Sequence, residues 1–277
     1  MKNYLLLFFI LFSIISRSQV QSNELDTITL SSTIKPIERF KVESISSKEI
    51  VNNDAIILTP ILNRIAGVNM QQGALNTSRV TIRGIGSRAQ FSTNRLKLYV
   101  NNIPLTDANG ESVLDDFDMN SIGSINVVKG PKASEYGSNL GGTIMFNTKR
   151  PSNPFDIQLG IGSFNRLFLA ANGSVDLDNT TIQLFYNQID SDEYRQNSEY
   201  ERQNLSLFSQ SKLGDKWFLE NLFIGTRLKA FIPSSLNQTD FETNPQLAAG
   251  NWYASAGFES YDKFVLGSTF VHLYIIR

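Results

Sequence analysis

The chain has 277 residues, a formal net charge of −1, one histidine and no cysteine. The lack of cysteine excludes disulfides, thiolate zinc sites, iron–sulfur clusters and thiol nucleophiles, and one histidine leaves little for a histidine-rich metal site. The near-zero charge argues against nucleic acid as a partner, because proteins that bind phosphate backbones carry a basic excess. Charged residues make up only 18% of the chain, below the roughly 25% of ordinary soluble domains, which favours strands over surface helices.

Residues 1–18 have the pattern of an export signal. Lys2 precedes an almost unbroken apolar run over residues 4–15, and small and polar residues follow up to Ser18. The run is too short to cross about 30 Å of hydrocarbon as a helix, but it fits the core of a signal peptide. The alternative is a buried N-terminal helix, which the absence of an amphipathic continuation disfavours. We therefore expect an exported chain that begins at Gln19 and enters any membrane as strands.

Residues 19–41 are polar and poor in helix signals, which is typical of an extended arm. Threonine alternates with aliphatic residues in one short stretch of this arm, a pattern that favours an extended strand. The stretch consists of Asp26, Thr27, Ile28, Thr29 and Leu30. A strand with free backbone groups can pair with the sheet edge of another protein. A linker without a partner is the alternative.

Residues 42–150 have the pattern of a small α+β domain. Apolar residues at helical spacing over 54–66 end at Gly67, and Pro60 places the start of this helix close to residue 60. Alternating patterns predict strands at 79–83, 95–100, 122–128 and 143–148.

Three patterns in the chain resemble chemical sites without meeting their requirements. Residues 84–89 match a dinucleotide fingerprint, but no helix pattern begins there. Asp115, Asp116 and Asp118 lack the spacing of a calcium loop, so we expect a solvated acidic loop. His272 lies in an alternating strand pattern without a nucleophile motif. We therefore expect no catalytic residue, no metal site and no cofactor, and a protein that is not an enzyme.

Six short segments form a family pattern. They span residues 63–68, 80–84, 98–104, 122–131, 136–138 and 141–144. In this order, behind a signal peptide, they resemble the plug domain of TonB-dependent outer-membrane receptors, in particular iron-complex receptors of the Bacteroidetes type. The resemblance covers residues 42–150, and residues 26–30 stand where that family has its TonB box.

The resemblance also implies roles for individual plug residues. Arg83 matches a family position and is expected to hold a carboxylate of the barrel wall, with an anionic ligand as the alternative. Lys129 stands where the family has arginine, a position implied to latch the plug to the wall. Lysine cannot form the two-pronged contact of arginine with a carboxylate, so the latch at Lys129 should be weaker. Two turn-rich tips, 71–76 and 86–94, are expected to face the ligand. The candidate ligand contacts are Gln71, Gln72, Arg88, Gln90 and Phe91.

Residues 151–277 have the pattern of the N-terminal part of a transmembrane β-barrel. Apolar residues recur with a period of two, short turns are predicted at 176–179, 213–216 and 261–263, and long loops at 190–202 and 230–251. A soluble β-sandwich is the alternative, which would not explain the plug pattern before it. The predicted fold class is therefore an α+β plug domain followed by antiparallel transmembrane β-barrel strands in an incomplete barrel.

The length of this second region predicts about seven strands, at roughly ten residues per strand. Plugged transporters close their barrels with about 22 strands. We therefore expect the N-terminal part of a receptor, from a truncated, split or incomplete reading frame.

The resemblance implies a receptor in the cell outer membrane that imports a scarce ligand, with a ferric chelate or siderophore favoured. Its implied partners are a TonB-like energy-transducing protein, the outer membrane with its barrel-assembly machinery, and a small iron chelate. A binding or assembly module that does not transport, and a nutrient receptor for glycans or peptides, are the alternatives.

Overall fold

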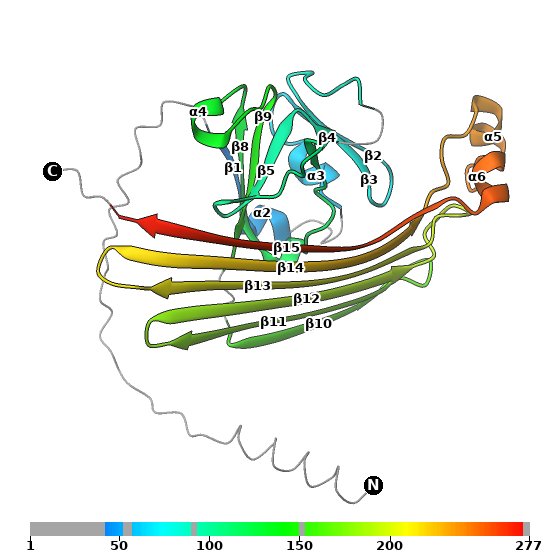
Figure 1. The fold of residues 1–277 in the computed structure, drawn as a ribbon. Helices are drawn as coiled ribbons and strands as arrows, with labels where there is room; N and C mark the ends of the chain where they lie inside the picture. The colour runs from blue at the N-terminus through cyan, green and yellow to red at the C-terminus, as the bar shows by residue number, and fades with distance from the viewer. Residues whose placement is uncertain (1–41, 52–56, 90–92, 150–152, 274–277) are drawn as a thin grey trace, which may run out of the picture. The chain divides into compact units, whose positions relative to one another are not determined.

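The computed structural model describes residues 42–51, 57–89, 93–149 and 153–273 (Figure 1). The expected signal peptide and the stretch at residues 26–30 lie outside them. All described residues belong to one compact unit. We call residues 42–149 the plug and the strands that follow it the wall. In the described part of the chain, no helix has the length and apolar content needed to cross a membrane.

The plug is built on a five-stranded mixed sheet with the order β1-β8-β9-β5-β6. Its strands are β1 (Val42–Ser46), β8 (Ile122–Lys129), β9 (Gly142–Thr148), β5 (Leu96–Val100) and β6 (Ile103–Pro104). Neighbours pair antiparallel except β5 and β9, which are parallel. The edge strand β1 therefore pairs with β8 alone in this sheet.

Short elements complete the plug. Two two-stranded sheets pair β2 (Val68–Ala74) with β3 (Thr77–Ile82) and β4 (Thr93–Asn94) with β7 (Glu111–Ser112). The helices are α2 (Ser47–Val51), α3 (Thr59–Leu62), α4 (Ala133–Tyr136) and the 3₁₀ turn η1 (Met119–Ser121).

The sequence-based element predictions for the plug are largely confirmed. The four predicted strands correspond to β3, β5, β8 and β9, and the helix begins with Pro60 in its first turn. This helix ends earlier than predicted, at Leu62, and the chain turns at Gly67 with a φ of 78°. Strand β2 was missed, because polar residues at 71 and 72 and the glycine that follows them favoured a turn.

The wall consists of six antiparallel strands, each paired with the next along the chain (Figure 1). They are β10 (Phe155–Ile161), β11 (Leu167–Leu177), β12 (Thr180–Ser191), β13 (Tyr200–Lys212), β14 (Trp217–Phe231) and β15 (Phe258–His272). A single continuous sheet of this order has the pairing of barrel strands and not of a sandwich, which confirms the predicted fold class. The described residues hold six strands where about seven were estimated, because β12 to β15 are longer than ten residues.

One predicted turn in the wall is wrong. Residues 261–263 lie inside strand β15, whose fifteen residues pair without a break with β14. Their polar character has another cause. The side chain of Asp262 pairs with Arg227 on the face of the wall that points away from the plug, whereas Tyr261 and Lys263 contact the plug.

The plug packs against the wall through a shared apolar core. This core includes plug residues such as Ile103 and Phe117 and wall residues Leu222 and Ile224. The approach is close at Gly267, where an added Cβ would lie 2.5 Å from Cγ2 of Ile103. The wall therefore needs a residue without a side chain at this point.

We predict that Gly142→Ala destabilises the plug sheet. An added Cβ would lie 2.2 Å from the carbonyl oxygen of Val128, and the φ of +140° is one that alanine rarely adopts. Strain of this kind costs roughly 1–3 kcal/mol, so amide hydrogens of β8 and β9 should exchange faster. Gly214→Ala is the control, because nothing lies within 4 Å of its added Cβ. Equal exchange in the two variants would contradict the prediction.

Candidate functional site between the plug and the wall

The acidic loop of the plug is buried, so the expectation of a solvated loop is wrong. Asp115, Asp116 and Asp118 are 4%, 2% and 1% exposed. A buried carboxylate is stable only where hydrogen bonds and charges satisfy it. Several of the hydrogen-bond partners of this loop lie on the wall.

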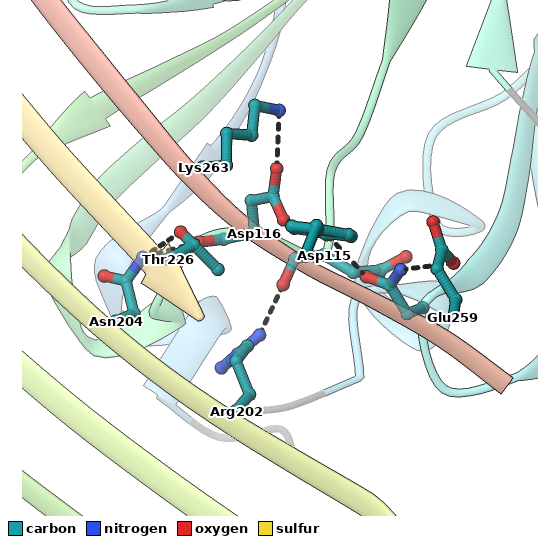
Figure 2. A network of polar contacts seen from close by, with 9 residues as sticks. Asp115, Asp116, Arg202, Asn204, Thr226, Glu259 and Lys263 are labelled. Carbon is teal, nitrogen blue, oxygen red and sulfur yellow. Dashed lines mark hydrogen bonds and ion pairs between the residues drawn. The ribbon is translucent and has the colours of Figure 1, made fainter. Parts of the chain in front are cut away.

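Asp116 is the centre of this contact (Figure 2). Its carboxylate accepts hydrogen bonds from the Tyr261 hydroxyl at 2.5 Å and from the Lys263 ammonium at 2.7 Å. Its carbonyl oxygen accepts from Asn204 Nδ2 at 2.7 Å and from Thr226 Oγ1 at 3.4 Å. One residue is thus fastened to three successive wall strands, β13, β14 and β15.

Asp115 adds a second attachment (Figure 2). The buried guanidinium of Arg202 donates to the carbonyl oxygen of Asp115 and, at 3.1 Å, to Oδ1 of Asn187. The carboxylate of Asp115 accepts from the Ser78 hydroxyl on β3 at 2.5 Å. We call the contact between Asp115 and Asp116 and their wall partners the clasp; the partners are Arg202, Asn204, Thr226, Tyr261 and Lys263.

The clasp is continuous with the β2–β3 hairpin. Asn76 at the hairpin turn donates from Nδ2 to Glu259 of β15 at 3.0 Å, and its Oδ1 lies 3.4 Å from the Tyr261 hydroxyl. Leu75 packs with Tyr261 against an apolar cluster of the wall. Tyr261 therefore contacts both the hairpin turn and Asp116.

Burial sets the protonation of two carboxyl groups in this loop. Desolvation raises the pKa of Asp115 to about 6, although the hydrogen bond from Ser78 and the charge of Arg202 oppose the rise. Desolvation also raises the pKa of Asp118 to about 6, against the hydrogen bond that Asp118 accepts from the backbone of Asn120. These groups change charge at mildly acidic pH.

The two residues expected to latch the plug to the wall contact the plug itself. The ammonium of Lys129 donates to the Ala66 carbonyl oxygen and lies 3.6 Å from Oε1 of Glu43 on β1. Arg83 is exposed at a left-handed φ of 52° and packs over Gly67. Among the described residues, neither side chain has a hydrogen bond or ion pair with the wall. The latch expected at Arg83 and Lys129 therefore stays a prediction, and the buried polar contacts between the plug and these six wall strands are those of the clasp.

The expected ligand-facing residues lie in two connected segments. Arg79 donates to the side chain of Gln71 and to the carbonyl oxygens of Ser87 and Ala89, at 3.0 Å and 2.7 Å for the latter two. It therefore ties strand β2 to the loop that carries the exposed Arg88.

A cleft of about 450 Å³ lies at this loop, lined by residues 84–89 together with Asn94 and Arg95. Gln72 lies outside the lining of this cleft and is half-buried beside Thr59, whose hydroxyl lies 3.4 Å from its Oε1. Gln90 and Phe91 lie outside the described residues. In the part of the chain that the structure describes, no group of three or more histidine, aspartate or glutamate residues is placed to hold a metal ion.

Comparison with known proteins gives a family match for the plug. Residues 39–143 match the model of the TonB-dependent Receptor Plug Domain. The Vitamin B12 transporters BtuB of Vibrio vulnificus strains CMCP6 and YJ016 are 26% and 27% identical over 177 and 227 residues. These matches cover 59% and 75% of this chain, which spans 28% and 36% of the relatives' length.

Solved structures share the fold of both regions. The unliganded ferric citrate transporter FecA matches with a TM-score of 0.63 at 20% identity, over 76% of this chain and 34% of its own. The ferric yersiniabactin uptake receptor FyuA from Yersinia pestis matches with a TM-score of 0.58 at 17% identity, over 73% and 33% of the two chains.

We predict that Asp116→Asn loosens the plug. The substitution keeps the size of the side chain but removes the charge that pairs with Lys263, whose side chain is 32% exposed. Leaving such a donor partly unpaired costs roughly 1–3 kcal/mol, so amides of residues 113–121 should exchange about five- to 150-fold faster.

Two variants serve as controls for this measurement. Asp262→Asn breaks the neighbouring ion pair with Arg227, whose side chains are 53% and 71% exposed, so little stability should be lost. Arg83→Gln should also leave the exchange unchanged. Equal effects of Asp116→Asn and Asp262→Asn would show that the clasp does not hold the plug.

We predict that the plug is held more firmly at pH 5 than at pH 8. The pKa of Asp115 and of Asp118 rises from 3.8 to about 6 on burial. Between these values the folded protein binds more protons than the unfolded chain, so the stability of the fold around these groups falls as the pH rises from about 4 to 6. Asp118→Asn keeps an oxygen for the hydrogen bond from Asn120 and should flatten this dependence. The measurement is amide hydrogen exchange of the plug at both pH values, corrected for the pH dependence of the intrinsic exchange rate. An unchanged difference between pH 5 and pH 8 in the Asp118 variant would show that Asp118 does not cause the pH dependence.

Proposed function

We propose that this chain, which belongs to the TonB-dependent receptors through its plug domain and first barrel strands, is part of an importer in the outer membrane. The observation that carries this proposal is the clasp, which holds the plug, built on its own five-stranded sheet, against one face of the wall strands. A plug held by polar contacts can be released without breaking covalent bonds. Import of this kind needs no enzymatic step.

Export and energy supply complete the proposal. Residues 1–18 serve as the signal peptide, and the barrel-assembly machinery inserts the strands. Asp26 to Leu30 act as the TonB box, where a TonB-like protein adds its strand edge to edge. This segment precedes β1, which is an edge strand paired with β8 alone, so a pull on the arm reaches β1 first.

A ferric chelate is the favoured ligand. Two arginines, Arg88 and Arg95, are among the described residues that line the cleft, and no acidic residue is, which suits an anionic chelate. FecA and FyuA, whose fold this chain shares, are named for ferric citrate and ferric yersiniabactin. A corrinoid is the second candidate, because the curated relatives are named Vitamin B12 transporters.

We predict that Ile28→Pro abolishes uptake and leaves ligand binding intact, because proline removes a backbone donor from the pairing strand. The measurement is uptake of ⁵⁵Fe-citrate and of ⁵⁷Co-cyanocobalamin by cells that depend on the full receptor, with binding assayed on the same cells. Ser22→Pro, in the same arm but outside residues 26–30, is the control and should import normally. Normal uptake by the Ile28 variant would refute the proposed TonB box. The label that accumulates distinguishes the two candidate ligands.

A further inference from the structure

A second cavity lies between the plug and the wall, away from the clasp. It has a volume of about 380 Å³. The plug contributes Asn101, Asn102, Asn147 and Thr148, and the wall contributes Thr181, Gln183, Phe208, Gln210 and Glu220. On β14, Glu220 is six residues from Thr226 of the clasp, which corresponds to about 20 Å along the strand. The cavity therefore lies toward the end of the wall with the short turns.

The chemistry of the lining is that of neutral hydrogen bonding. Five of the nine lining residues are amides, two are threonines, and none is Lys, Arg or His. The carboxylate of Glu220 already accepts from Asn102 Nδ2 at 3.1 Å and from Gln210 Nε2 at 2.9 Å. An anion entering the cavity would meet this negative charge without a balancing cation, so the lining selects against anions.

One lining side chain has an unused acceptor. Gln183 is 6% exposed, and its Oε1 has no hydrogen-bond partner in the described structure. Ser174, directly opposite on β11, has a hydroxyl that also lacks a partner there. Buried polar atoms normally have partners, so the wall behind the lining has unmet hydrogen-bonding capacity, although neither atom is exposed to the cavity itself.

We propose that this cavity binds a neutral, hydroxyl-rich group of the size of a monosaccharide. Hydroxyl groups match amides because each hydroxyl both donates and accepts, and Phe208 offers an apolar surface to the carbon skeleton. In the proposed importer, which this part of the inference assumes, the cavity receives the hydroxyl-bearing part of a cargo on its way past the plug. The binding itself does not depend on transport.

The absence of cysteine from the chain permits a direct test. Thr181→Cys places a thiol in the cavity of the full receptor, isolated from outer membranes in detergent, and the rate of its reaction with a maleimide is measured on the peptide that contains residue 181. Glucose and gluconate are the probes, because they share a carbon skeleton and differ in charge. Glucose should slow the labelling saturably, with half-protection at a concentration at least tenfold below that of gluconate.

Matched variants separate binding from other effects. Gly214→Cys places a thiol in the exposed turn between β13 and β14, where neither sugar should alter the labelling rate. Gln183→Leu, combined with Thr181→Cys, should raise the half-protecting concentration of glucose at least tenfold. Thr148→Cys approaches the cavity from the plug side and replaces Thr181→Cys if that variant does not assemble.

The outcomes also separate this inference from the proposed function. Protection that persists in the Ile28→Pro background, where uptake is lost, supports the site independently of transport. Labelling that glucose does not slow beyond the Gly214 control, or that gluconate slows equally, would overturn the inference and leave a cavity filled by water alone. If glucose protects the thiol in a protein that imports neither iron citrate nor cobalamin, the binding site is supported, and the proposal that it receives part of these cargoes is rejected.

Discussion

The position of the plug depends on the burial of Asp115 and Asp116 against the wall. Two adjacent peptide carbonyl groups and a carboxylate lose their hydration when this loop is buried. A carboxylate without hydrogen-bond partners would be strongly destabilising in this environment. The wall supplies donors from Arg202, Asn204 and Lys263. Each lies at the position along its strand where the strand passes the loop. Because the donors come from different strands, sliding the plug along any one of them breaks several contacts together.

Local sequence patterns predicted the helices and strands. The clasp joins residues that are far apart in the sequence, and local patterns carry no information about such pairs. Alternation located β3, β5, β8 and β9, since their apolar residues face one core. The clasp joins Asp116 to Tyr261, 145 positions away, and this pairing follows from the register of strands around the wall. Inward polar residues at 202 and 204 were a usable signal, since an inward polar face is typical of barrel strands. The cluster of aspartates was misread because its partners lie elsewhere in the chain.

Lys129 connects three elements of the plug. Its ammonium binds Glu43 and the Ala66 carbonyl oxygen, and so connects β1, β8 and the turn before β2. In the proposed importer, force enters at the start of β1. It therefore meets the β1–β8 ladder and the Lys129 contact before it reaches the clasp, which follows from the position of β1 at the sheet edge.

The two ends of the plug–wall contact differ in what opening them costs. At the clasp, Asp115, Asp116 and Arg202 are buried and Lys263 is only partly exposed, so breaking these contacts leaves poorly solvated polar groups. At the amide-lined cavity, the groups already face a space large enough for water or a ligand, and separation changes their solvation less. A plug attached in this way should loosen first at the cavity and last at the clasp. In that order, the plug would separate from the wall at the end with the short turns while the clasp still holds its other end.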